Sequence, residues 1–366
     1  MTNSPRLILA GDNATPIWGM TSATRIARLF DKQQVEIAIS PDAAIWADTG
    51  YAFDPQWLRH VTANPGVVIT ISGVPVLAHL RHRDEVAAIT RGEIPADHQV
   101  IEYNDQPQIY NHELRKLDTP FLSALTPATV REIERKSYFG AYKGVTDILT
   151  KYLWPEFALV LTRIAAKLGM TPNMVTAIGA ILCVAATYLF YTGYFWTGML
   201  LGFIFMVLDT VDGKLARCTI TSSYWGNVFD HGIDLVHPPF WWLAWAFGCA
   251  AVGHPLGYHM FIFILIAIFG GYVAQRLIEG VFIWAFGIHI HVWRPIDSQF
   301  RLITARRNPN MVLLFAGLLI GRPDLGLIWV AYWTVISLGI HLLQMLQAAI
   351  VKAQGKPIVS WLRAPA

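Results

Sequence analysis

Short apolar runs separated by turn residues fill the first part of the chain, whereas long apolar stretches dominate the rest. In the first part, residues 7–10, 35–39, 67–71 and 76–80 are typical of short strands, and residues 23–30 have helical spacing. Strands interleaved with a helix predict a small α/β domain over residues 1–112.

A more charged region follows and predicts a connector over residues 113–170. Between residues 145 and 168, apolar side chains recur at helical spacing, and Lys143, Lys151, Arg163 and Lys167 supply a basic face. This pattern favours an amphipathic helix lying at a membrane surface, bent at Pro155. The alternative is a core helix of the soluble domain.

The longest apolar stretches predict six transmembrane helices in a helical membrane domain over residues 171–352, with a tail at 353–366. Residues 171–208 carry no charge and turn near Gly193, which gives two spans of about 20 residues each. Residues 235–275 are also uncharged and turn between Gly253 and Gly257, which gives two more. The last two spans are predicted over about residues 310–320 and 325–351.

Composition supports a membrane protein and excludes several other classes. The chain is 54% hydrophobic and 14% charged, which is too apolar for an ordinary soluble enzyme. A net charge of +3 gives no nucleic-acid footprint. The cysteines 183, 218 and 249 have no CxxC spacing, so neither a disulfide frame nor a zinc site is predicted. No signal peptide is expected at the N-terminus.

Basic residues set the expected orientation. The connector, the loop with Lys214 and Arg217, the loop after the fourth span and the tail all fall on one side, and the opposite loops hold little beyond Arg322. The positive-inside bias makes that side the cytoplasm. We therefore expect an inner membrane protein of bacterial type, with both termini and the α/β domain in the cytosol and with membrane lipids as partners.

Four aspartates lie between the second and third predicted spans. Asp209 and Asp212 are three residues apart, and Asp230 and Asp234 are four apart, so each pair shares a helical face. Carboxylates at a membrane edge are costly to place, and an all-oxygen site favours Mg²⁺ or Mn²⁺. Such ions bridge phosphate oxygens, so phosphoryl transfer is the predicted chemistry. His231 is expected either to take no part in metal binding or to contact a metal ligand without being one itself.

The full spacing resembles the signature of the CDP-alcohol phosphotransferase family: DxxDGxxAR, eight residues, then GxxxDxxxD, over residues 209–234. The resemblance implies that an acceptor hydroxyl attacks a CDP-alcohol such as CDP-diacylglycerol and releases CMP, in phospholipid or polar-lipid synthesis. It also implies that a homodimer is an arrangement open to the chain. The implied roles are metal binding by Asp209, Asp212, Asp230 and Asp234, general-base catalysis by Asp234, and nucleotide binding by Asp209, Gly213, Ala216, Arg217 and Gly226.

Simpler interpretations stand beside several of these roles. Gly213 and Gly226 also suit close helix packing, and Arg217 also suits a charge that reaches the membrane surface. Basic residues expected at an acceptor or lipid phosphate are Lys151, Arg301, Arg306 and Arg307, which equally suit lipid-facing charges. Arg276 and Glu279, in or near the fourth span, are expected to form an ion pair.

The first domain resembles a degenerate sugar-nucleotide nucleotidyltransferase. The resemblance rests on RLILAGDNAT at residues 6–15, on Arg25, and on AIWADTGYAFDP at 44–55, which contains Asp48. Gly11 has no glycine two residues on. This departure from the glycine-rich loop of that family indicates a degenerate copy, because backbone amides need glycine to come close to phosphates. Two alternatives to a phosphotransferase alone stay open: a bifunctional enzyme of the inositol-phosphate type that also makes its CDP-alcohol from CTP, and a cation transporter that uses the aspartates.

Overall fold

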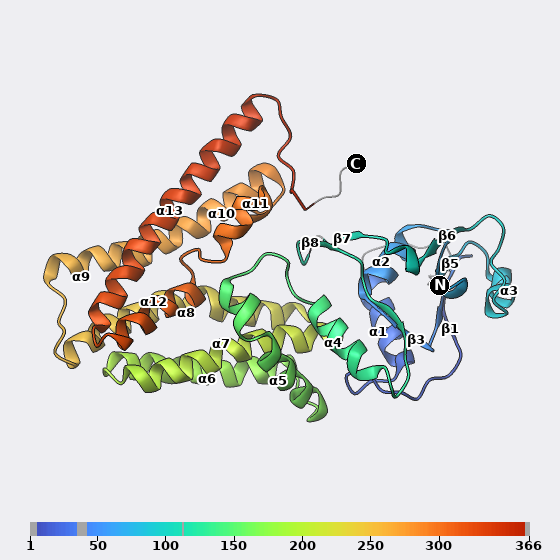
Figure 1. Cartoon of the computed structure of the whole chain (residues 1–366), viewed down its shortest axis with the longest axis horizontal. Helices are drawn as coiled ribbons and strands as arrows, with labels where there is room; N and C mark the ends of the chain where they lie inside the picture. The colour runs from blue at the N-terminus through green and yellow to red at the C-terminus, as the bar shows by residue number, and fades with distance from the viewer. Residues whose placement is uncertain (1–5, 35–41, 112, 363–366) are drawn as a thin grey trace. The chain divides into compact units, whose positions relative to one another are not determined.

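The computed structural model describes residues 6–34, 42–111 and 113–362, and these residues form two compact units (Figure 1). Unit 1 holds the chain up to Tyr142, together with Arg163–Gly169 and Lys214–Thr221. Unit 2 holds Lys143–Thr162, Met170–Gly213 and the chain from Ser222 onward. The strand expected at 35–39 and the domain end expected at residue 112 lie outside the described residues. The predicted domain bounds stay a prediction.

A five-stranded sheet organises unit 1, which confirms the expected α/β domain. Its order is β1 (Arg6–Ala10), β2 (Ala44–Asp48), β5 (Val74–Leu80), β4 (Val67–Ile71) and β6 (Gln99–Glu102). The outer pairs β1–β2 and β4–β6 are parallel, and β5 runs antiparallel to both of its neighbours. Parallel β1 and β2 place their carboxyl ends, Ala10 and Asp48, at the same edge.

Side chains of β2 alternate between two apolar layers. Ile45 and Ala47 pack with helices α1 (Ser22–Gln34) and α2 (Pro55–Ala63), and Trp46 packs with α3 (Val86–Thr90). This alternation is the period of a strand with both faces covered. Helix α2 begins where the Asp54 side chain accepts a hydrogen bond from Gln56 N at 2.9 Å, which caps the helix.

The remaining elements of unit 1 are short strands, short 3₁₀ turns and one helix. Strand β3 (Tyr51–Phe53) pairs with β9 (Leu122–Ala124), and β7 (Ile109–Asn111) pairs with β8 (Lys116–Asp118). The 3₁₀ turns are η1 (Arg83–Glu85) and η2 (Tyr103–Asp105), and helix α4 spans Val130–Gly140.

Unit 1 also includes the ends of two helices that begin in unit 2, α5 (Pro155–Lys167) and α7 (Phe195–Cys218). From the end of α5, Arg163 Nε donates to Glu134 Oε2 at 3.2 Å. From the end of α7, Lys214 Nζ lies 3.0 Å from the ring centroid of Tyr142, and Thr219 O accepts from Arg28 Nη1 at 3.1 Å. Neither helix therefore belongs to one unit alone.

Unit 2 is built from helices. Besides the first part of α5, they are α6 (Pro172–Tyr191), most of α7, α8 (Tyr224–Ala251), α9 (Tyr258–Leu265), α10 (Tyr272–Phe286), α11 (Pro295–Arg301), α12 (Arg307–Leu319) and α13 (Pro323–Ala353), with the π-helical turn η4 (Ile266–Gly271) joining α9 to α10 and the 3₁₀ turn η5 (Ile290–Val292) before α11. Within the described residues, three runs are long and apolar enough to cross a membrane: Pro172–Tyr191, Tyr258–Phe286 and Pro323–Ala353. A membrane protein is supported, but the expected number of six spans is not confirmed.

Close backbone approaches and tryptophan hydrogen bonds hold unit 2 together. Helices α6 and α8 lie side by side (Figure 1), and Trp241 Nε1 donates to Cys183 O at 3.2 Å between them. Gly248 lets α8 approach the backbone of Phe190, and Trp245 Nε1 donates to Pro323 O at the start of α13. Glycine and tryptophan thus let these helices pack at short range.

The expected amphipathic helix is broken at the predicted proline. A π-helical turn, η3 (Leu149–Leu153), ends before Trp154, and α5 begins at Pro155. Proline lacks an N–H and suits the first turn of a helix. Phe157 and Leu168 are exposed apolar side chains along this segment, as a membrane-surface helix requires, and that location stays a prediction.

Candidate metal and phosphate site

Helices α7 and α8 carry the signature residues. Ser223 caps the start of α8: its hydroxyl accepts a hydrogen bond from Gly226 N at 3.0 Å, and this bond fixes the first turn. Asp230 and Asp234 follow one turn apart on α8, and Asp209 lies on α7. The local sequence therefore brings carboxylates from two helices into reach of one another.

Three of the four aspartates converge. Asp209, Asp230 and Asp234 each place a carboxylate oxygen within 4.8 Å of the others, a spacing that suits an oxygen-ligand cation site. Among the described residues, Asp212 is not part of this group. It is buried, and its Oδ2 accepts a hydrogen bond from Thr176 Oγ1 at 2.6 Å. Its role as a metal ligand stays a prediction.

Arg307, at the start of α12, contacts two of these carboxylates. Its Nη2 lies 2.7 Å from Asp209 Oδ2, and its Nη1 lies 2.6 Å from Asp234 Oδ1. Charge-assisted bonds of this kind are among the stronger polar contacts in proteins. We expected Arg307 at an acceptor phosphate, and the sequence gives no signal for this pairing because 73 residues separate Arg307 from Asp234.

A further polar network fixes Arg307. Its Nε donates to Asn308 Oδ1 at 3.1 Å, and Asn308 Nδ2 in turn donates to Asp147 Oδ1 at 3.0 Å. Thr150 Oγ1 donates to Asp147 Oδ2 at 2.8 Å. No sequence pattern indicates a role for Asn308, Asp147 or Thr150, because Asn308 meets the other two from a segment far along the chain.

The remaining signature residues lie outside the converging carboxylates. Gly213, Ala216 and Arg217 are half-buried in the last turns of α7. A Cβ at Gly226 would lie 2.8 Å from Asn173 Oδ1, so this glycine permits a close approach of α8 to the start of α6. That geometry supports the packing interpretation of Gly226. His231 is 64% exposed and its Nδ1 lies 3.7 Å from Asp230 Oδ2, which suits an outer group.

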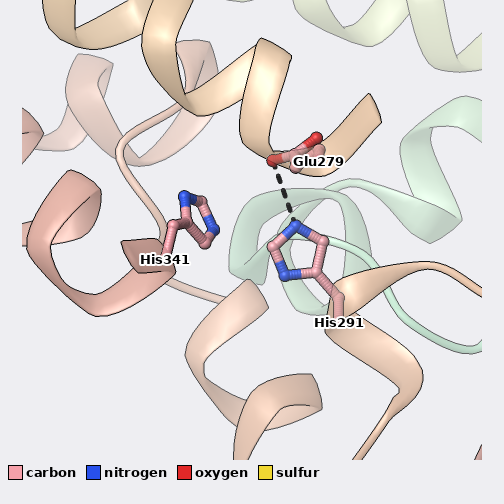
Figure 2. A group of neighbouring side chains, drawn as sticks. All are labelled: Glu279, His291 and His341. Atoms are coloured by element: carbon pink, nitrogen blue, oxygen red, sulfur yellow. Dashed lines mark hydrogen bonds and ion pairs between the residues drawn. The ribbon is translucent and has the colours of Figure 1, made fainter. Parts of the chain in front are cut away.

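A second buried polar group lies on α10, η5 and α13 (Figure 2). Glu279 Oε1 is 3.2 Å from His291 Nε2, and His341 completes the group with ligand atoms within 4.8 Å. His341 is fully buried, and neither of its ring nitrogens has a hydrogen-bond partner. Buried polar atoms without a partner are costly, so this group invites a ligand.

The charges around this second group favour an anion over a metal. Arg306 Nη2 donates to Glu279 Oε2 at 2.5 Å, and Arg276 Nη2 lies 3.1 Å from Glu279 Oε1, which confirms the expected Arg276–Glu279 ion pair. Burial and the charge of Arg306 hold the pKa of Arg301 well below its ordinary value, and Arg301 Nη1 is buried without a partner. Three guanidinium groups against one carboxylate would repel a further cation.

Lys151 has different surroundings from the arginines. It lies exposed on η3, with Nζ 5.3 Å from the ring centroid of Tyr152. A lysine in this position suits a lipid headgroup as well as a substrate phosphate.

In unit 1, the structure brings two of the predicted nucleotide-binding features together. Gly11 has φ +72° after β1, and a Cβ there would lie 3.5 Å from Asp48 Oδ1 at the end of β2. Arg25 instead points into the core, where its Nη1 donates to Phe53 O at 2.9 Å, and burial lowers the pKa of Arg25. Arg25 is therefore committed to the fold.

Known proteins are similar to the helical part of this chain. Residues 169–336 match the model of the CDP-alcohol phosphatidyltransferase family. Cholinephosphotransferase 1 of Gallus gallus is 32% identical over 152 residues, which cover 35% of this chain and 44% of that protein. Phosphatidylinositol phosphate synthase of Streptomyces avermitilis is 37% identical over 93 residues, which cover 24% of this chain and 38% of that protein. The chain thus spans less than half the length of these curated relatives.

Among solved structures, phosphatidylinositol phosphate synthase of Mycobacterium tuberculosis, in complex with manganese and citrate, has a TM-score of 0.42 and 18% identity to this chain. The alignment covers 52% of this chain and 88% of that one.

Proposed function

We propose, from the family match over residues 169–336, that this chain is a membrane CDP-alcohol phosphotransferase. It transfers the phosphoalcohol group of a CDP-alcohol to an acceptor hydroxyl, releases CMP, and acts in phospholipid or polar-lipid synthesis. The observation that carries the proposal is the convergence of Asp209, Asp230 and Asp234 from two helices inside the matched region. A site of this kind suits phosphoryl transfer, in which the protein mainly positions groups and stabilises charge.

The aspartates fit a divalent cation, Mg²⁺ or Mn²⁺. Three carboxylate oxygens are close together, and a guanidinium already bonds to two of these carboxylates, which shows that the group accepts positive charge. Asp209, Asp230 and Asp234 would hold the ion, with Asp212 as a fourth candidate. When bound, the ion neutralises charge that develops on the pyrophosphate of the CDP-alcohol.

Asp234 is proposed as the general base. Its side chain is 42% exposed, against 17% for Asp209 and 27% for Asp230, so it is the most open of the three to an entering hydroxyl. A carboxylate within hydrogen-bond reach of the acceptor can take its proton as the new bond to phosphorus forms. Asp209, Gly213, Ala216, Arg217 and Gly226 are proposed to shape the nucleotide site, on the spacing of the signature alone.

The direct test of this function is the metal-dependent release of CMP. Purified protein in detergent, given CDP-diacylglycerol, Mn²⁺ and a panel of hydroxyl acceptors, should release CMP, and a chelator should abolish the release because the aspartates then lack their cation. Readdition of Mn²⁺ should restore it. Chelator-insensitive release would contradict the metal assignment. No release with any CDP-alcohol, together with metal uptake into vesicles, would favour the cation-transporter alternative.

We propose that the second buried polar group, together with the arginines beside it, binds the phosphate of an acceptor or of a lipid. Arg301 and Arg306 have buried guanidinium nitrogens without hydrogen-bond partners, and His341 adds two unpartnered ring nitrogens. Bidentate guanidinium groups match the geometry of phosphate oxygens. Lys151 is also proposed to bind a phosphate, and its exposed position on η3 suits the headgroup of a membrane lipid.

A second activity is proposed for unit 1 on the closeness of Gly11 and Asp48. A glycine after a strand lets backbone amides approach phosphates, and a neighbouring carboxylate can hold a cation beside them. If this unit is an active cytidylyltransferase, the full chain given CTP, Mg²⁺ and a phosphorylated alcohol should release pyrophosphate, and Asp48→Asn should reduce that release at least tenfold. Equal release from both proteins would assign the activity elsewhere.

The location and assembly stay proposals as well. We propose an inner membrane protein with both termini and the site on the cytoplasmic side, as the distribution of basic residues indicates. A homodimer is proposed by resemblance alone.

A further inference from the structure

We propose that Arg307 is a built-in counter-ion of the aspartate group, which holds the carboxylates together before a divalent cation binds and competes with that cation. The inference rests on the proposed metal site. It assigns Arg307 a positioning role in place of the phosphate contact expected from the sequence.

The geometry of Arg307 is that of a cation bridging two ligands. Its two terminal nitrogens bond separately to Asp209 on α7 and Asp234 on α8, at 2.7 and 2.6 Å. These two residues, with Asp230, are the ones whose oxygens converge. The guanidinium therefore joins the two helices through the same side chains that a metal would use.

The position of Arg307 is also fixed from its other sides. The side chain is only 11% exposed, its Nε donates to Asn308, and its guanidinium carbon lies 5.0 Å from the ring centroid of Phe205. The hydrogen bond and the aromatic face restrict the guanidinium, so little additional conformational freedom is lost when it forms the two ion pairs. Arg307 is thus part of the built site.

Electrostatics gives the consequence. Three converging carboxylates repel one another without a cation, and the single charge of Arg307 offsets part of that repulsion. A divalent cation bound to the same carboxylates would lie within a few ångströms of the guanidinium and be repelled by it. Metal binding must therefore lengthen or break at least one Arg307 ion pair.

Mn²⁺ binding to the full-length protein in detergent, followed by calorimetry, tests the inference without any turnover. Arg307→Gln keeps a polar side chain but removes the charge, and we expect its Kd for Mn²⁺ to fall by about tenfold or more. Arg307→Lys keeps the charge, and its Kd should stay within about threefold of wild type. Arg322→Gln, which removes an equal charge paired to Asp324 at the start of α13, should leave the Kd unchanged.

A second measurement uses the unaltered protein and keeps the test valid if Arg307→Gln fails to fold. Mn²⁺ should increase the labelling of Arg307 by the arginine reagent phenylglyoxal, read by peptide mass spectrometry, and should not change the labelling of Arg322. Weaker Mn²⁺ binding by Arg307→Gln, or labelling of Arg307 that Mn²⁺ does not raise, would overturn the competition. Absence of Mn²⁺ binding by the wild-type protein would instead count against the proposed metal site itself.

Discussion

Replacing Asp234 by Asn should lower the rate of CMP release by about 10²–10⁴-fold. The amide has nearly the same shape as the carboxylate, so packing on α8 is kept, but it cannot accept the proton of the acceptor hydroxyl. The loss should appear in kcat at saturating Mn²⁺ and CDP-alcohol. Measuring the Kd for Mn²⁺ in the same variant separates a lost base from a lost metal ligand.

The matched control for this variant is Asp324→Asn. Asp324 is also ion-paired with an arginine, Arg322, at 2.7 Å, but it lies at the start of α13 and outside the converging group. Its replacement should leave the rate of CMP release within about twofold of wild type, because Asp324 lies outside the aspartate group. A partly exposed ion pair also contributes little to the stability of the fold. Turnover like that of wild type in Asp234→Asn would remove Asp234 as the base.

Replacing Gly248 by Ala should destabilise unit 2 by about 1–3 kcal/mol or more. The added Cβ would overlap the backbone oxygen of Phe190 and lie 3.0 Å from Phe195 Cζ. A backbone oxygen cannot rotate away as a side chain can, so α6 and α8 must separate. Thermal unfolding in detergent, followed by far-UV circular dichroism, should show a lower midpoint.

Gly339→Ala provides the comparison for Gly248→Ala. Gly339 lies inside α13, and a Cβ there would meet no heavy atom within 4 Å. Alanine has the higher helix propensity, so this change should be neutral or slightly stabilising, by up to about 1 kcal/mol. An equal loss of stability in both variants would show that the helix contact at Gly248 is not the cause.

The aspartate group was predictable because its geometry is largely local. Asp230 and Asp234 are one helical turn apart, and a short connection returns the chain from α7 to α8, so the spacing in the sequence nearly determines the spacing in space. Asp212 is the exception. It lies three residues after Asp209 but hydrogen-bonds to Thr176 on α6, a partner that no local pattern indicates.

Contacts across the fold were beyond the reach of the sequence. Arg307 reaches the aspartates from a helix that starts far along the chain, and sequence alone could only class it as one more basic residue in a loop. The same holds for His291 and His341, which meet Glu279 from separate elements. In unit 1, short apolar runs bounded by turn residues predicted strands β1, β4 and β5, whereas their order in the sheet depends on strand pairings that these runs do not encode.

Helices α5 and α7, which each have residues in both units, limit where the chain can be divided. Unit 1 is assembled from three separate stretches, two of which are the tails of helices rooted in unit 2, and Lys214 and Cys218 in one of those tails are each only 3% exposed. A chain shortened by removing its first 142 residues would therefore uncover side chains on the helix that carries the aspartates. Because residues 163–169 and 214–221 belong to the same compact unit as the first 142 residues, such a deletion would leave the ends of α5 and α7 without the rest of their unit.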